Sequence, residues 1–137
     1  MVSAIKNFTN GPWQMFTRLP NGVRFVNNGA DECVALANFV VVCVHRKPLP
    51  RNIRAARDFW ETFDTNPDLN RNYTRSNKPH IGALVIMRSG GFDAKYGHIE
   101  VVTYVSKNGK KFNTRGQNGL HRWMWKYTRK LDKSNLS

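Results

Sequence analysis

The sequence has no apolar run that approaches the roughly 18 residues of a membrane-spanning helix. Its first residues, MVSAIKNFTNGPW, also lack the apolar core of a signal peptide. We therefore expect no membrane span and no secretion by a signal peptide. A role outside the cytoplasm would need another route of export.

Cysteine is scarce, with only Cys33 and Cys43 in the chain. Neither belongs to a C-x-x-C pair, so we expect no zinc site. If the segment between them is helical, ten residues separate the two by about 15 Å of rise. Bridged cysteines need Cα atoms within about 7 Å, and a strand would place them farther apart. The sequence therefore predicts two independent thiols.

Acidic residues are also few, with 9 Asp and Glu against 22 Lys and Arg and a formal charge of +13. Such an excess attracts polyanions: nucleic acid, anionic membrane or the acidic polymers of a bacterial wall. The basic residues are spread over several segments, and no single helix concentrates them as a basic-region DNA binder would. Nucleic acid therefore has no motif in its favour.

Length and composition indicate one globular domain, residues 1–137. The chain is 40% hydrophobic and 12% aromatic, and it is long enough to bury a core without disulfides or metals.

Residues up to about Asn28 are rich in turn motifs. Apart from Asn38, every residue from Cys33 to Val44 is apolar, and Asp31 can cap a helix there. This run exceeds a typical strand, which predicts a helix buried on nearly all sides.

A second helix is expected over residues 52–63, where apolar residues form one stripe. Beyond a polar loop the pattern changes to strands. Four are expected, at residues 82–87, 97–105, 110–115 and about 121–128. Helices followed by antiparallel strands predict an α+β fold. The last strand places Trp123, Trp125 and Tyr127 on one face, which suits a nucleic-acid stacking platform, although we favour core packing.

Cys33 is the candidate nucleophile, because a thiol at a helix N-terminus benefits from the positive end of the helix dipole. The adjacent carboxylates of Asp31 and Glu32 oppose that effect. A nucleophilic thiol needs a base, and His98 is the best candidate because it opens an expected strand. The other three histidines, in basic or turn-rich surroundings, are expected at the surface.

Three motifs resemble the CHAP domain, a cysteine- and histidine-dependent amidohydrolase/peptidase of the papain-like NlpC/P60 group. They are GADECVALANFV, IGALVIMRSGGFDAKYGHIEVVTYV and RGQNG, in the family's order and spacing. The resemblance implies a papain-like α+β fold, with N-terminal helices packed on a C-terminal antiparallel sheet. It implies Cys33 as nucleophile, His98 as base and Asn118 as the residue that orients the base. Such domains cut amide bonds in peptidoglycan and are common in bacteriophage lysins.

The chain departs from the family pattern at several positions. Ala83 replaces the Asp of a GDIVVF-like strand, and Gly116 replaces the acidic residue two before the orienting Asn. Glu100 stands two after the histidine, where a small residue is usual. The acidic calcium loop of some relatives is missing. We hypothesise that the carboxylate has moved from position 116 to Glu100. The alternative is that Glu100 pairs with a surface arginine such as Arg115.

The hairpin turn SKNGKK tests this hypothesis through its register. A two-residue loop would place His98 opposite Gly119, with Asn118 facing away. A three-residue loop, with Gly109 left-handed, would place His98 opposite Asn118 and Glu100 opposite Gly116. The chemistry requires the second register.

These observations predict a monomeric cysteine amidase or endopeptidase of peptidoglycan that needs no cofactor or metal. Its catalytic residues would be Cys33, His98, Asn118 and Glu100. We expect peptidoglycan, and with it anionic wall polymers, as partners; we expect no membrane span, and we favour these partners over nucleic acid. As a phage lysin it would reside in the virion or in the host cytoplasm before release and act at the wall. Two alternatives remain open: a non-catalytic basic module that binds wall polymer or nucleic acid, and an injected amidase toxin.

Overall fold

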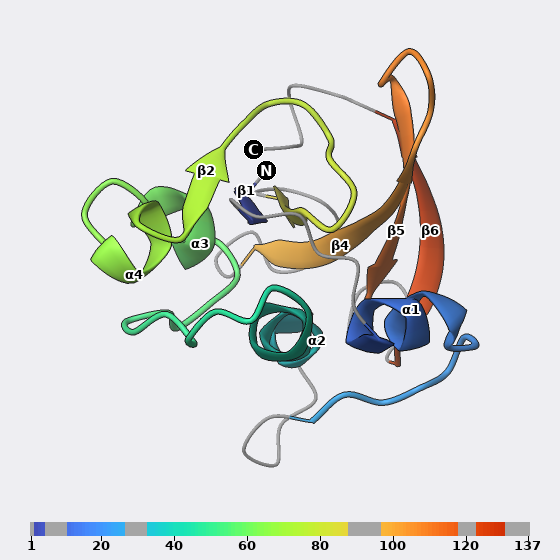
Figure 1. Ribbon diagram of the computed structural model, residues 1–137, viewed down its shortest axis with the longest axis horizontal. Coiled ribbons are helices and arrows are strands. Elements are labelled where there is room, and N and C mark those ends of the chain that lie inside the picture. The colour runs from blue at the N-terminus through green and yellow to red at the C-terminus, as the bar shows by residue number, and fades with distance from the viewer. Residues whose placement is uncertain (1, 5–10, 27–32, 88–96, 118–122, 131–137) are drawn as a thin grey trace.

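A computed structural model describes residues 2–4, 11–26, 33–87, 97–117 and 123–130 (Figure 1). Its centre is a six-stranded sheet in the order β2-β1-β3-β4-β5-β6, and every neighbouring pair is antiparallel. Helices and an antiparallel sheet agree with the predicted α+β class. The strands are β1 (Val2–Ala4), β2 (Tyr73–Arg75), β3 (Leu84–Met87), β4 (His98–Val105), β5 (Lys111–Gly116) and β6 (Trp125–Lys130).

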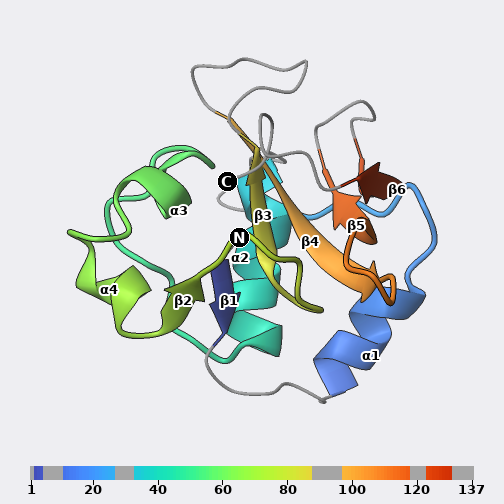
Figure 2. The same cartoon turned by 90° about the horizontal axis from the view of Figure 1, so that it is seen from above.

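The sequence predicted a sheet confined to the C-terminal half of the chain, but the sheet also contains a strand from the N-terminus. The four predicted strands are present as β3 to β6, but the N-terminal β1 inserts between β2 and β3. Figure 2 shows this order, with the short β2 and β1 on one side and the long β4 and β5 on the other. No helix among the described residues is long and apolar enough to cross a membrane.

The apolar segment that begins at Cys33 forms the central helix. It is α-helical over Cys33–Phe39 (α2) and continues as a π-helical turn over Val40–Val44 (η1). The predicted helix is therefore confirmed, but it is not buried on nearly all sides, because Val42 is 46% exposed. Cys33 and Cys43 are both free, as predicted.

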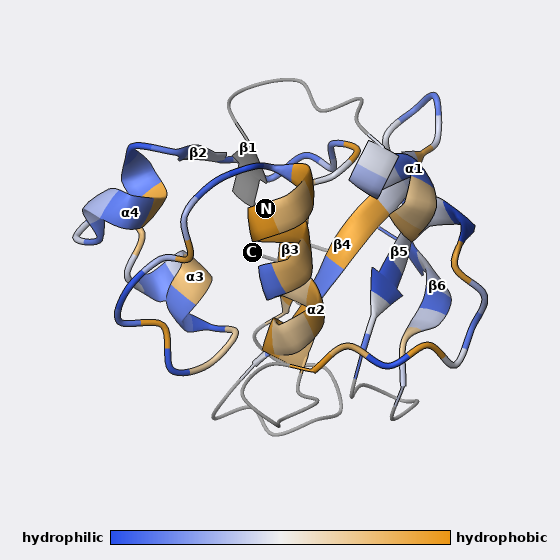
Figure 3. Cartoon of the chain, turned by 60° about the horizontal axis from the view of Figure 1, so that its bottom comes forward, coloured by the Kyte–Doolittle hydropathy of each residue, from blue (hydrophilic) through white to orange (hydrophobic). Residues whose placement is uncertain are grey.

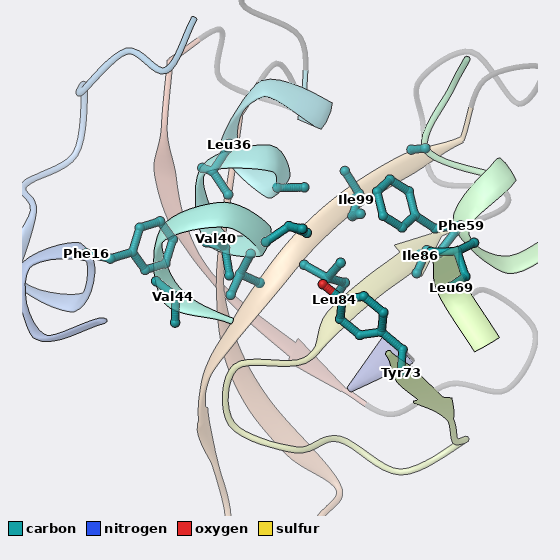
Figure 4. Packing of buried hydrophobic residues seen from close by; sticks show 14 of the residues in the cluster. Phe16, Leu36, Val40, Val44, Phe59, Leu69, Tyr73, Leu84, Ile86 and Ile99 are labelled. Atoms are coloured by element: carbon teal, nitrogen blue, oxygen red, sulfur yellow. The ribbon is translucent and has the colours of Figure 1, made fainter. Parts of the chain in front are cut away.

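The main hydrophobic core lies between this helix and the sheet. Leu36 and Val40 belong to the same buried cluster as Ile99 of β4 and Leu84 and Ile86 of β3 (Figure 4). Burying a side chain of this size stabilises a fold by about 1.5–3 kcal/mol. Because α2 packs on β4, the core fixes the helix that begins at Cys33 against the strand that begins at His98.

An N-terminal helix, α1 (Gly11–Arg18), occupies the region that the turn motifs had marked as irregular. Pro12 lies in its first turn, where a missing N–H removes no helical hydrogen bond. Phe16 is fully buried and joins the main core. The burial of Phe16 thus anchors a helix in a segment where the turn-forming residues had led us to expect none.

The second predicted helix is much shorter than expected. Only Asp58–Glu61 (α3) is α-helical, and Asn52 has a left-handed backbone with φ of 63°. The Asp58 carboxylate accepts hydrogen bonds from the N–H groups of Arg54 and Ala55, which stabilises a turn instead. A further short helix, α4 (Pro67–Asn70), interrupts the segment predicted as a polar loop.

The aromatic residues near the C-terminus are half-buried rather than in the core. Trp123, Trp125 and Tyr127 lie outside both hydrophobic clusters, and the buried residue among them is Met124. The guanidinium of Arg24 lies 5.0 Å from the Trp123 ring centroid. The favoured prediction of core packing was therefore wrong for this row.

The β4–β5 hairpin reaches the required register by a different route from the one predicted. Val105 pairs with Phe112, which leaves a loop of residues 107–110, with Gly109 left-handed at φ of 72°. The register then shifts between Val102 and Tyr104. This β-bulge restores the offset, so Glu100 pairs with Gly116 as the hypothesis required.

Candidate active site

Cys33 is the first residue of α2. Its side chain is half-buried and packs against the main core. Figure 3 shows the helix as the most continuously hydrophobic element. The thiol is thus anchored by a largely buried helix, lies at its first residue and stays partly exposed.

His98 is the first residue of β4 and is only 4% exposed. Gly97 precedes it with φ of 69°, in the left-handed region that favours glycine. A Cβ at Gly97 would also lie 3.0 Å from the carbonyl oxygen of Met87 and 3.2 Å from the Cβ of Arg57. Gly97 therefore sets the tight entry into β4 that positions the imidazole.

The structure places the Cys33 thiol and the His98 imidazole close enough to interact. The His98 Nε2 lies 3.1 Å from Oε2 of Glu100. Burial lowers the pKa of His98, but hydrogen bonds and charge interactions with Cys33 and Glu100 outweigh it and raise that pKa to about 9. The imidazole is therefore protonated at neutral pH.

Glu100 is fully buried and its carboxylate has three hydrogen-bonding partners. Thr114 donates its hydroxyl to Oε1 at 2.6 Å, and His98 donates to Oε2. Arg129 of β6 donates Nε to Oε1 at 2.9 Å and Nη2 to Oε2 at 2.5 Å. Burial raises the pKa of Glu100, but His98 and Arg129 hold it well below its usual range. The carboxylate is therefore ionised and fixed in orientation.

The sequence offered two hypotheses for Glu100, and the structure combines parts of both. Glu100 does contact His98, and it also pairs with an arginine, but that arginine is Arg129. Arg115 instead donates to the carbonyl oxygens of Leu19 and Thr17. Sequence reasoning missed Arg129 because its partner lies two strands away across the sheet. The available signal was that Arg129 follows Trp125 and Tyr127 at every second position, so it shares the face of the sheet that contains Gly116.

Gly116 provides the space that Glu100 occupies. A Cβ at this position would lie 2.7 Å from Cγ of Glu100 and 3.0 Å from its Oε2. Real Cβ contacts essentially never fall below 3.0 Å. The glycine at the family's acidic position and the glutamate on the facing strand are therefore sterically matched.

Asn118, the residue predicted to orient His98, lies outside the described residues, as do Asp31 and Glu32. Its neighbour Gln117 is fully buried and was not singled out by the sequence. The Gln117 side chain donates to the carbonyl of Phe25 and accepts from its N–H, both at 2.7 Å. It thereby ties the end of β5 to the segment that leads toward Cys33.

The other histidines do not join this group. His80 is exposed, as expected, and His121 lies outside the described residues. His45 was expected at the surface, but it is buried between the Gly82 carbonyl and the Tyr73 hydroxyl. Burial lowers the pKa of His45 to about 4. It therefore serves as a neutral structural histidine. Within the described ranges, no three His, Cys, Asp or Glu residues group as metal ligands.

Comparison with known proteins agrees with this geometry. The family model of the CHAP domain matches residues 24–118, well over half of the chain and a range that contains Cys33, His98 and Glu100. No curated protein and no solved structure gives a significant match. CHAP domains are generally hydrolases of amidase or peptidase type, with a papain-like fold and peptidoglycan as substrate. The chain belongs to the CHAP domain family.

Proposed function

We propose that this protein is a peptidoglycan hydrolase that cleaves an amide or peptide bond with Cys33 as nucleophile and His98 as acid and base. The observation that carries the proposal is the continuous line of contacts from Cys33 through His98 to Glu100. A thiol, an imidazole within hydrogen-bonding reach and a group that orients the imidazole are the parts that cysteine hydrolases need.

The reaction would proceed in two stages. The Cys33 thiolate attacks the scissile carbonyl carbon, and the His98 imidazolium gives its proton to the leaving nitrogen as the C–N bond breaks. His98 then takes a proton from water, whose oxygen attacks the thioester. The C–S bond breaks, and the products are a carboxylic acid, which loses its proton to solvent, and the regenerated thiolate–imidazolium pair. The N–H of Cys33 would stabilise the oxyanion, worth about 3 kcal/mol.

Glu100 would stabilise the imidazolium in both stages, because its buried carboxylate contacts Nε2 and is itself held by Thr114 and Arg129. Asn118 would assist in fixing the ring. The alternative of a non-catalytic binding module rested on the absence of a carboxylate at position 116, where the chain has Gly116. Glu100 places a carboxylate beside His98 and so favours the enzyme over a binding module.

The setting we propose is that of a phage lysin, present in the virion or host cytoplasm before release and acting as a monomer at the bacterial wall. An injected amidase toxin would share the same chemistry and would differ in its delivery and in an immunity partner.

Purified bacterial walls in a zymogram or a turbidity assay test the proposal directly. Wild type should clear the walls, Cys33→Ala should not, and Cys43→Ala serves as the matched control because the same thiol is removed from a position away from His98. Product analysis identifies the bond that is cut, because cleavage of the sugar–peptide amide leaves a carboxylate on the lactyl group, whereas cleavage within the peptide leaves a new peptide carboxylate. Clearing by Cys33→Ala at the wild-type rate would end the cysteine-hydrolase proposal.

A further inference from the structure

The exposed face of the β5–β6 hairpin carries positive charge, and none of its described residues on that face is acidic. Lys111 pairs with Lys130 directly across the two strands, and Arg115 pairs with Lys126. Opposed residues of an antiparallel pair share one face of the sheet. Both lysine side chains of the first pair are exposed, and so is Lys126. We call Tyr104, Lys111, Asn113, Lys126, Thr128 and Lys130 the cationic strip.

From the register and burial of these strands, we infer that the cationic strip binds a linear phosphodiester polymer of the kind attached to bacterial walls. This choice of polymer depends on the proposed function, while the presence of an anion-binding surface does not. Figure 3 shows β5 and β6 in largely hydrophilic colours, to one side of α2. Lys111, Asn113, Lys126, Thr128 and Lys130 are all exposed, so solvent reaches this part of the sheet.

The like-charge pairing is unfavourable for the fold alone. Directly opposed like charges destabilise an antiparallel pair, typically by a few tenths of a kcal/mol up to about 1 kcal/mol. Among described residues 97–117 and 123–130, the single acidic residue is Glu100. It lies on the opposite face and is already bound by Arg129. An external anion is therefore the partner that would neutralise Lys111 and Lys130.

The bulge in β4 adds an aromatic ring to the strip. Strict alternation would place Tyr104 on the face of Glu100, but the shift after Val102 pairs it with Asn113 instead. Tyr104 is 55% exposed, and Asn113 accepts a hydrogen bond from Thr128. The ring and these polar groups lie between the cations and can contact the sugar or polyol parts of a polymer.

A phosphodiester polymer without bases fits this surface better than nucleic acid. Single-stranded nucleic acids bind to successive aromatic rings on which successive bases stack. The strip offers one ring, whereas Trp125 and Tyr127 alternate with its residues and lie on the other face of β6. A polymer bound here also leaves the face of His98 and Glu100 free for peptidoglycan.

The test compares Lys111→Gln/Lys130→Gln with a control, Arg71→Gln/Lys78→Gln, which removes two exposed charges elsewhere. Binding of fluorescently labelled poly(glycerol phosphate) is measured by anisotropy over a range of salt, with a single-stranded oligonucleotide of equal phosphate number as competitor. We expect the strip variant to bind at least about tenfold more weakly and the control to change less than twofold. Loss of two contacts should also make the slope of log K against log salt shallower by about 1.4.

Two further measurements separate the possible failures. The melting temperature of the strip variant should be unchanged or higher, since a repulsion is removed, and hydrolysis of soluble wall fragments without polymer should be unchanged. Polymer binding without hydrolysis by the wild type would contradict the proposed function alone. Equal weakening of polymer binding in the strip variant and the control would overturn the inference. So would tighter binding of the oligonucleotide than of the polymer together with loss of oligonucleotide binding in Tyr104→Ala, because that result would assign the strip to nucleic acid.

Discussion

Gly116→Ala tests whether the space for Glu100 matters to the site. The added Cβ would meet Cγ of Glu100 at 2.7 Å, so Glu100 must move. Thr114 and Arg129 hold the carboxylate by hydrogen bonds, so the movement must strain these bonds or the one to His98. Overpacking costs about 1–3 kcal/mol, and a lost hydrogen bond to a charged group costs about 1.5–3 kcal/mol.

These magnitudes predict two separate effects. At roughly 4 °C per kcal/mol for a domain of this size, the melting temperature should fall by about 4–12 °C. Wall hydrolysis at a temperature where the variant is folded should fall by about 10–100-fold, since each 1.4 kcal/mol is a factor of ten. Gly11→Ala is the matched control, because nothing lies within 4 Å of a Cβ there. Wild-type turnover and stability in Gly116→Ala would refute the steric argument.

Three other predictions concern the same site. Glu100→Gln should lower turnover by at least about tenfold and should also lower the melting temperature, because His98 and Arg129 lose their buried charged partner; equal turnover would remove Glu100 from the mechanism. The pKa of His98 is raised to about 9, so the imidazolium persists below that pH and is lost above it. Activity and the stability from this pairing should therefore fall as pH rises through about 9, and a pH–rate profile of Glu100→Gln should show this limb at lower pH. Activity should survive EDTA, and restoration of lost activity by calcium or zinc would reveal a metal requirement.

The sequence predicted the strands of the hairpin and the register at the site, but it predicted the wrong turn. A three-residue loop was expected, whereas the loop spans residues 107–110 and a bulge before Tyr104 compensates. Both solutions place Glu100 opposite Gly116. The hydrophobic pattern near the site determines which residues face the core, while the loop and the bulge can exchange one residue without changing that pattern.

Other features depended on contacts that no local pattern contains. His45 lies next to lysine and arginine in the chain, yet its ring is buried by Tyr73 and the Gly82 carbonyl, which come from distant segments. The helix expected from residue 52 is interrupted because Asn52 adopts a left-handed backbone and Asp58 bonds to the preceding turn. Propensity favours a helix there, but side-chain hydrogen bonds to the backbone stabilise another conformation.

The relocated carboxylate shows why a family motif should be compared by position in space. At position 116 a carboxylate would extend from β5, whereas here Glu100 extends from β4 into the same space beside His98. Arg129 then becomes necessary, because a buried carboxylate needs charged or hydrogen-bonding partners on every side. Arg129 lies beyond the residues matched by the family model. The site therefore combines family residues with an arginine from the edge strand. Substitution of Glu100 or Gly116 alone should be poorly tolerated, whereas a double variant that moves the carboxylate back to position 116 and places glycine at position 100 can be tolerated.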